Sequence, residues 1–445
     1  MTALRIAATG LVCAATLTAC SGDEDDAFDC HVMPVCDAAR SDCQARVFSA
    51  TACAREQTGA SMPPIRTITA QEFAAELRQS IEAEPNAQPD PWEQAAKLLG
   101  LSPPELPLSD VLVDDLVSNV VAFYDPETKR VSLIAEHAGD AESATFVLSH
   151  EFVHALQDQA SDLTAFHDQA TSTDQSVAID TLVEGEAMIH PNMLIVRGAK
   201  RRPETIDWDS YVSGLQSSAF EAIDGSQAPF FTAMNGLPYS VGFRFLIGPW
   251  LDGGQRAINA LFETPLLSFG QWAFATGPDR LRPADPLTCF PTGAPSGFTG
   301  FDHDRLGVVG LMGLRMTFGE PASTAFGLAS ALGDDSFVVF STPDPARGVA
   351  VAWRLRFDIA SRASSFADAV LGAFVGVVSV QTLERDVLIR AASDASVLAT
   401  WTNASDCGRA EDLPAPPSQA GATSALRARL PGARTRASTR TSRSR

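Results

Sequence analysis

The sequence predicts an α+β protein that is mainly helical and carries small β-hairpins. The chain has 445 residues, of which 45% are hydrophobic and 20% are charged, so it can bury a large core and is not a disordered chain. Two stretches, 141–159 and 173–197, repeat apolar residues at helical spacing. Shorter runs alternate apolar and polar residues and come in pairs around turn residues, which is typical of β-hairpins.

The first twenty residues predict export. An apolar run at 6–16 ends in Leu17-Thr18-Ala19-Cys20. Such a short run followed by small residues is typical of a secretory signal peptide. The ending resembles the lipobox of bacterial lipoproteins, which implies removal of residues 1–19, acylation of Cys20 and anchoring in the bacterial cell envelope, with Ser21 favouring the outer membrane. The alternative is an ordinary signal peptide with an incidental cysteine.

Six further cysteines agree with an oxidising compartment and predict a disulfide-stapled N-terminal segment. They are Cys30, Cys36, Cys43, Cys53, Cys289 and Cys407. The first four lie within twenty-four residues and predict two local bridges, for which three connectivities are possible, and the last two predict a long-range bridge. A zinc knuckle on Cys30, His31 and Cys36 is the alternative, but the spacing does not match the usual zinc pairs.

The remaining elements follow from the same periodicities and from turn residues. Before the long helices we predict an acidic spacer and cysteine-rich segment at 20–62, a linker at 61–67, helices at 70–84 and 91–99, and a hairpin of strands at 120–124 and 130–135. After them we predict loops at 268–300, a helix at 306–318, a hairpin of strands at 337–341 and 349–357, a helix at 364–373 and a strand pair ending near Ala392. The domains are then the signal peptide at 1–19, the segment at 20–62, a core at 63–300, an α/β part of the same unit at 301–412 and a disordered basic tail at 413–445.

The first long helix contains His150-Glu151-Phe152-Val153-His154. Residues four apart lie on one face of a helix, so both imidazoles can bind one metal ion. Zinc accepts two histidines at this spacing, and a glutamate between them can act as general base toward a water molecule. We therefore predict Zn²⁺ held by His150 and His154, with Glu151 as the catalytic base.

A catalytic zinc ion usually has a third protein ligand. The second long helix contains Leu182-Val183-Glu184-Gly185-Glu186-Ala187, whose two glutamates lie about 200° apart around the helix axis, so only one can face the metal. This run resembles the third-ligand helix of gluzincin metallopeptidases, which implies Glu184 as the ligand, with Glu186 and then His190 as alternatives. Gly185 is expected to allow close helix packing.

The chain departs from the thermolysin-type pattern, which places an Asp four residues after the ligand Glu, because it has Met188 at that position. Another residue must then orient the ligand histidines. The two candidates are Asp158, one turn after His154, and Asp180, one turn before Glu184.

Peptide hydrolysis also needs a donor for the oxyanion that develops on the carbonyl oxygen. Tyr239, in a Pro-Tyr element, is the first candidate. His303 is the second, because the flanking Asp302 and Asp304 favour its protonated form.

The resemblance extends beyond the zinc motif to one group of secreted gluzincin-like proteins of bacteria and archaea. It is carried by residues 121–130, Leu237-Pro238-Tyr239-Ser240-Val241-Gly242, Ala257-Ile258-Asn259 with Pro265, and Gly333-Asp334-Asp335. It implies a zincin-like core, over about residues 63–392, in which an active-site helix and a glutamate helix bring the ligands together.

The charge narrows the class of partner. The net charge is −21, although the last nineteen residues carry seven Arg and no acid, so we predict no nucleic-acid partner. We predict an exported, lipid-anchored zinc metallopeptidase whose partners are a peptide or protein substrate and, through the anchor, the membrane. The alternatives are a non-catalytic surface lipoprotein with a structural or vestigial zinc site, and a metal hydrolase that acts on a non-peptide amide.

Overall fold

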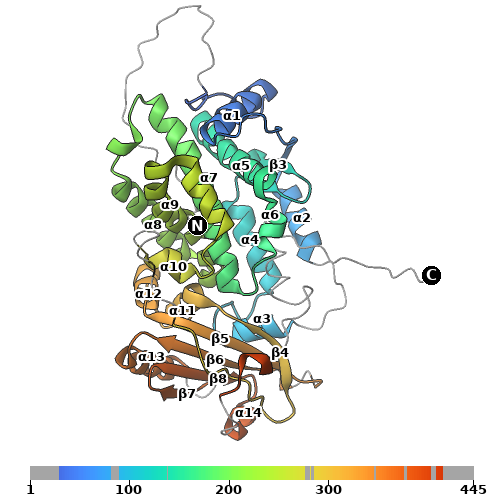
Figure 1. Cartoon of the computed structure of the whole chain (residues 1–445). Coiled ribbons are helices and arrows are strands. Elements are labelled where there is room, and N and C mark those ends of the chain that lie inside the picture. The colour runs from blue at the N-terminus through green and yellow to red at the C-terminus, as the bar shows by residue number, and fades with distance from the viewer. Residues whose placement is uncertain are drawn as a thin grey trace, which may run out of the picture.

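The computed structural model describes residues 30–81, 90–137, 139–275, 281, 285–344, 347–374, 378–401 and 407–413. Within these residues the architecture is mixed α+β, as predicted, and helices predominate over two small sheets. In Figure 1 the helices occupy the upper and central part of the molecule and the larger sheet lies at the lower end. The predicted signal peptide with Cys20, the acidic spacer and the tail from residue 414 lie outside the described residues.

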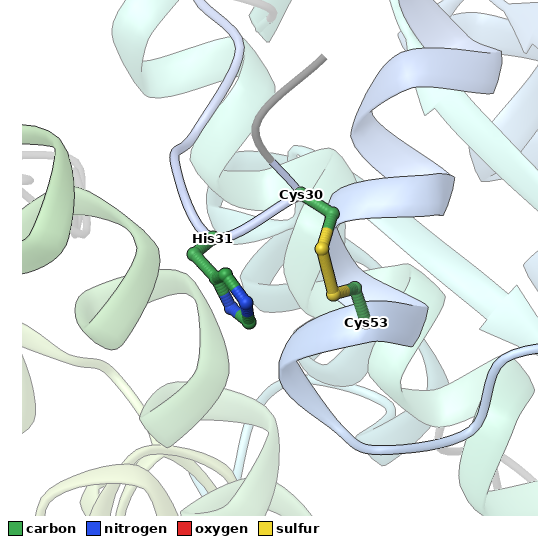
Figure 2. A group of neighbouring side chains, drawn as sticks. All are labelled: Cys30, His31 and Cys53. Atoms are coloured by element: carbon green, nitrogen blue, oxygen red, sulfur yellow. A yellow bond between two sulfur atoms is a disulfide. The ribbon is translucent and has the colours of Figure 1, made fainter. Parts of the chain in front are cut away.

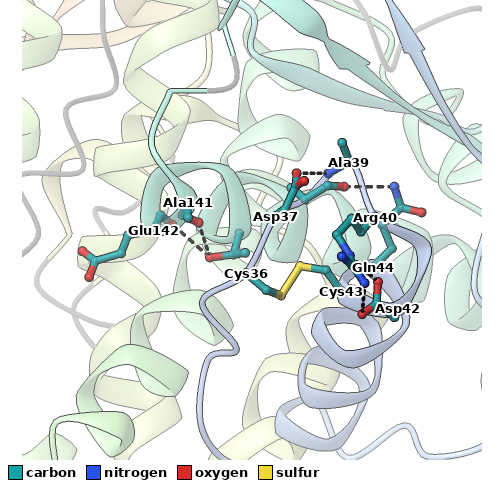
Figure 3. The surroundings of a disulfide bond; sticks show 11 residues. Cys36, Asp37, Ala39, Arg40, Asp42, Cys43, Gln44, Ala141 and Glu142 are labelled. Carbon is teal, nitrogen blue, oxygen red and sulfur yellow. Dashed lines mark hydrogen bonds and ion pairs between the residues drawn. A yellow bond between two sulfur atoms is a disulfide. The ribbon is translucent and has the colours of Figure 1, made fainter. Parts of the chain in front are cut away.

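The N-terminal segment, which we define as residues 30–60, is built around helix α1 (Ser41–Ala54) and two disulfides. Of the three possible connectivities the structure has Cys30–Cys53 and Cys36–Cys43. Figure 3 shows the second bridge, with Ala141 and Glu142 from the start of the next long helix among its surroundings. Gln44 secures the turn before α1 by donating its side-chain amide to the Ala38 carbonyl at 2.9 Å.

A three-stranded sheet follows, in the order β1-β3-β2. The predicted hairpin is confirmed as the antiparallel pair β2 (Ala122–Asp125) and β3 (Arg130–Ile134). Strand β1 (Ile65–Ile68) pairs parallel with β3, so the predicted linker at 61–67 is wrong beyond residue 64. The run is only four residues long, and its partner is 66 residues away, so local pattern did not reveal it. Helices α2 (Ala70–Ile81), α3 (Pro91–Leu98) and α4 (Leu108–Asn119) complete this region.

The two long predicted helices are confirmed as α5 (Ala141–Ser161) and α7 (Thr173–Gly198), joined through the short α6 (Leu163–His167). Each begins at a side-chain cap. Asp140 accepts a hydrogen bond from the Ser143 amide at 2.8 Å, and Ser172 accepts one from the Gln175 amide at 3.2 Å. These caps satisfy amides that a helix start leaves unpaired.

Helices α8 (Trp208–Gly225) and α9 (Pro229–Glu263) were not predicted from the sequence. Helix α9 contains Pro238 and Pro249 and has a left-handed residue, Gly254, with φ +62°. It packs closely against α7, because a Cβ on Gly185 would lie 2.5 Å from the Gly242 carbonyl carbon. The predicted packing role of Gly185 is therefore confirmed.

The C-terminal part contains an antiparallel five-stranded sheet in the order β4-β5-β6-β8-β7. Its elements, with the helices around them, are α10 (Phe269–Phe274), β4 (Thr299–Asp304), α11 (Gly307–Met316), α12 (Ala322–Ala329), β5 (Leu332–Ser341), β6 (Val349–Phe357), α13 (Ala360–Ala373), β7 (Val378–Leu383), β8 (Asp386–Ala392) and α14 (Ala395–Thr400). The predicted hairpin and the last strand pair are confirmed, whereas residues 268–300 contain α10 and the start of β4 in addition to loops. The predicted long-range bridge Cys289–Cys407 is present.

One hydrophobic cluster joins the helices to the sheet. It includes Leu182 on α7, Val241 on α9, Leu311 on α11 and Trp353 on β6, all at or near zero exposure. The two parts therefore share a core across residue 300. Among the described residues, none of the helices combines the length and apolar character needed to cross a membrane.

Candidate metal centre

Helices α5 and α7 bring three predicted ligands together. The Nε2 atom of His150 lies 3.0 Å from Oε2 of Glu184, and Nε2 of His154 lies 3.1 Å from Nε2 of His150 and 3.4 Å from the same Glu184 oxygen. The ligand atoms of the three residues all lie within 4.8 Å of one another. The geometry therefore groups Glu184, and not Glu186, with the two histidines.

The carboxylate of this cluster is held in its ionised form. Burial alone would lower the pKa of His154, but the Glu184 carboxylate outweighs it and raises that pKa to about 9. Burial would raise the pKa of Glu184, but His154 and His150 bring it well below its usual range. The carboxylate is therefore ionised and can pair with a proton-bearing imidazole or with a metal cation.

Glu151 lines the same pocket as the ligands. Its side chain is buried, and its Oε2 accepts a hydrogen bond from the Tyr124 backbone amide on β2 at 2.7 Å. Burial raises the pKa of this carboxyl above its usual range, although His150 and His154 partly oppose the shift. Strand β2 thus fixes the carboxylate and the interior makes it more basic.

Tyr239 reaches the site from α9. Its ring stacks on that of His150, with centroids 5.6 Å apart and planes 18° apart. Burial raises the pKa of its phenol well above 10, and Glu184 and Glu151 add to the shift. The phenol therefore keeps its proton and can donate a hydrogen bond.

His303 does not line this pocket. It lies on β4, opposite Val338 of β5 in the C-terminal sheet. Its neighbour Asp304 is buried and accepts hydrogen bonds from the amide and hydroxyl of Thr173 at 2.7 Å and 2.5 Å. The prediction of His303 as an oxyanion donor is wrong, because the residue lies on the C-terminal sheet away from the pocket that holds the ligands, and its neighbour Asp304 connects that sheet to the start of α7.

The two predicted orienting aspartates bind other groups. Asp158 accepts from the Tyr124 hydroxyl at 2.6 Å and from Lys129 Nζ at 2.7 Å. Asp180 bonds to His167 Nε2 at 3.0 Å. Both assignments are corrected by the structure, in which His154 Nδ1 contacts Gln157 Oε1 at 2.9 Å.

Sequence reasoning missed Gln157. On a helix, positions three and four residues after His154 flank the same face, so Gln157 and Asp158 were equally placed for contact. Gln157 is left for His154 because Asp158 is bound by Tyr124 and Lys129 of the β2–β3 hairpin. That contact depends on tertiary structure and is not visible in the helix pattern.

The candidate site opens into a cavity of about 240 Å³. The three ligands, Glu151 and Tyr239 line it, and the rest of its walls are largely apolar, with contributions from Phe123, Phe146, Met188 and Leu215. The hydrogen-bonded pair of His167 and Asp180 also lines it. The cavity therefore presents polar groups and an apolar surface next to each other.

A second group with metal-ligand atoms, Cys30, His31 and Cys53, lies in the N-terminal segment. Figure 2 shows that the two sulfur atoms are bonded to each other. Cys36 is bonded to Cys43, so none of these thiolates is left for the alternative zinc knuckle.

No protein-family model, curated protein or solved structure matches this chain.

Proposed function

We propose that this protein is an exported, lipid-anchored zinc metallopeptidase of the gluzincin type, with a zincin-like core formed around α5 and α7. One observation carries the proposal. Two imidazole nitrogens and a carboxylate oxygen lie within 4.8 Å of one another, beside a buried glutamate that lines the same pocket.

The residues present fit a zinc ion. His150, His154 and Glu184 supply two nitrogens and one oxygen, a donor set that zinc takes in catalytic sites while one position stays open. When bound there, zinc supplies a Lewis acid that polarises a carbonyl and lowers the pKa of water.

Glu151 is the proton-transfer group of the proposal. Its raised pKa suits a base that must accept a proton from water and then release it to the leaving amine. The Tyr124 amide holds one carboxylate oxygen at 2.7 Å, which fixes the direction of the transfer.

Tyr239 is the proposed donor to the substrate carbonyl oxygen. Its stacking on His150 holds the ring beside the ligands, and its high pKa keeps the proton on the phenol throughout the neutral range. The apolar walls of the cavity favour a peptide with an apolar side chain next to the cleaved bond.

The disulfides support export, since such bridges persist in oxidising compartments. We infer that an acylated Cys20 anchors the catalytic unit in the bacterial outer membrane, with peptide substrates reached from outside the cytoplasm.

The test is zinc content together with peptide cleavage by the purified mature chain. We expect about one zinc ion per chain, a large loss in His154→Ala and Glu184→Ala, and retention in Glu151→Gln with a fall in cleavage rate of at least ~100-fold. His303→Ala is the matched control and should keep both zinc and activity.

The alternatives predict different outcomes. Zinc binding without cleavage of a peptide library, and no effect of Glu151→Gln on any turnover, would favour the non-catalytic lipoprotein. Turnover of non-peptide amides alone would favour a metal hydrolase that acts on a non-peptide amide. A folded wild type that takes up no added zinc would refute the metal site.

A further inference from the structure

We propose that Gln157, Glu186 and Arg55 position the metal ligand His154, so that the disulfide-bonded N-terminal segment completes the metal site. We call these three residues the positioning relay. The inference rests on the proposed zinc site, and it gives a function to Glu186 and to a segment outside the zinc motif.

The relay begins with the ring of His154. The side-chain nitrogen of Gln157 donates to the Val183 carbonyl at 2.9 Å, and a carbonyl oxygen can only accept. The amide oxygen of Gln157 must therefore be the atom that faces His154 Nδ1 at 2.9 Å. Since that oxygen also only accepts, Nδ1 carries the hydrogen, and the lone pair of a neutral ring lies on Nε2, beside His150 and Glu184.

Glu186 holds the amide of Gln157 in this orientation. Its Oε2 accepts from Gln157 Nε2 at 2.9 Å, and its Oε1 accepts from Gln255 Nε2 at 2.6 Å. The side chain is fully buried, so its charge needs a cation nearby. Glu186, two positions after the metal ligand Glu184, thus binds groups on the opposite side of α7.

Arg55 supplies that cation. Its Nε lies 2.9 Å from Glu186 Oε1, and its Nη1 donates to the Leu156 carbonyl on α5 at 3.3 Å. The guanidinium therefore joins α7 to α5 immediately beside Gln157. Arg55 and Glu186 are 131 positions apart in the sequence.

The N-terminal segment holds Arg55 in place. Arg55 follows α1 and comes two residues after Cys53, which is bonded to Cys30 (Figure 2). On the same helix, Phe48 packs edge-on against Phe152 with centroids 5.2 Å apart, and the Thr51 hydroxyl lies 2.7 Å from that of Ser149. The segment thus contacts α5 directly before His150 and near Gln157.

A merely structural ion pair would stabilise the fold without affecting the metal. The chain offers a matched control in Arg354–Asp386, whose side chains are 7% and 5% exposed, against 4% and 0% for Arg55–Glu186. The control pair lies within the C-terminal sheet, on β6 and β8.

The experiment measures zinc dissociation constants of the mature chain by competition with a chromophoric chelator, and the melting temperature of the zinc-free protein. We expect Arg55→Met and Gln157→Leu each to weaken zinc binding by about 10- to 100-fold. The double variant, Arg55→Met with Gln157→Leu, should bind zinc no more weakly than the weaker-binding of the two single variants. This is expected because the two residues act on His154 in series. Arg55→Lys should bind zinc more tightly than Arg55→Met.

Arg354→Met should lower the melting temperature and leave zinc binding unchanged. Unchanged zinc binding in folded Gln157→Leu, which retains Arg55 and Glu186, would overturn the relay even if Arg55→Met failed to fold. An additive loss of zinc affinity in the double variant, or an equal loss in Arg354→Met, would also overturn it.

The wild type separates the relay from the proposed function. If the wild type binds zinc but cleaves no peptide, the proposed function fails while the zinc dissociation constants of the variants still decide the relay. A wild type without zinc would overturn both.

Discussion

Two regions of this molecule carry a disulfide and a buried pairing of arginine with a carboxylate, but they use the pairing differently. In the C-terminal sheet, Arg354 and Arg356 bind Asp386, each at 2.8 Å, between neighbouring strands. In the N-terminal segment, Arg55 binds Glu186 on a distant helix, and Glu186 continues to Gln157. The roles that we assign to the two ion pairs differ because Asp386 contacts neighbouring strands, whereas Glu186 also binds Gln157 beside a proposed metal ligand.

The largest expected effect on stability lies in the C-terminal region. Cys289–Cys407 spans 118 residues, and closing a loop of that length stabilises a protein by about 5 kcal/mol in the chain-entropy model. We expect Cys289→Ser with Cys407→Ser to lower the free energy of unfolding by this amount in a denaturant titration. Zinc affinity of the folded variant should not change. A weaker zinc site would show that the two regions are not separate in function.

A smaller loss of stability with a loss of zinc is expected in the N-terminal segment. Cys30–Cys53 spans 23 residues, which corresponds to about 3 kcal/mol. Because this bridge restrains Arg55, Cys30→Ser with Cys53→Ser should also weaken zinc binding, by about 10-fold. Removal of Cys36–Cys43, which spans 7 residues in the same segment, is the control and should leave zinc binding intact. Equal zinc affinity in both variants would contradict the link.

The two regions should also respond to pH with opposite sign. In the C-terminal sheet, burial raises the pKa of Asp335 to about 7. The native chain therefore holds this proton more tightly than the unfolded chain, so the stability that it contributes falls as pH rises from roughly 4 to 7. In the N-terminal pair, burial is outweighed by Arg55, which lowers the pKa of Glu186. That pair stabilises the fold above roughly pH 4, the ordinary range of a glutamate, and loses its contribution as pH falls further.

Asp335→Asn isolates the C-terminal effect. For one proton, the change in unfolding free energy between pH 5 and 7 is at most about 2.7 kcal/mol, and the variant should show correspondingly less pH dependence than the wild type. Thermal unfolding of the zinc-free proteins at the two pH values measures it. The variant loses part of the contacts of Asp335 with the Leu306 and Gly307 amides, so the comparison uses the slope with pH and not the absolute stability. Identical slopes would refute the assignment to Asp335.

The sequence predicted those parts of the fold that have a local pattern. Helices α5 and α7 and the hairpins are predicted correctly because their apolar periodicity and turn residues are visible within short stretches of sequence. Helix α9 was missed because it is buried on several sides and contains Pro238 and Pro249, so neither an apolar stripe nor an uninterrupted helical composition marks it. Strand β1 was missed because its pairing is remote.

The same limit applies to the candidate site. His150, His154 and Glu151 follow from spacing on one helix, and the opposed directions of Glu184 and Glu186 follow from helix geometry. The assignment of Gln157 depends on whether the hairpin binds Asp158 or its neighbour. The assignment of Arg55 depends on a contact with Glu186, 131 positions away in the sequence. The acidic neighbours of His303 suggested a protonated donor, but Asp304 is buried and binds Thr173 at the start of α7 instead.

The crossing of α7 and α9 also restricts how this protein can evolve. At most helix contacts a larger residue on one side can be offset by a smaller one on the other. Gly185 and Gly242 are already the smallest residues, so neither can shrink to offset a larger residue at the other. A Cβ on Gly242 would lie 2.0 Å from the Thr181 carbonyl oxygen. Stepwise substitution at these two positions can only move the helices apart, carrying Glu184 away from Tyr239. If the proposed function holds, we therefore expect changes of substrate preference to arise from the walls of the cavity while the crossing stays fixed.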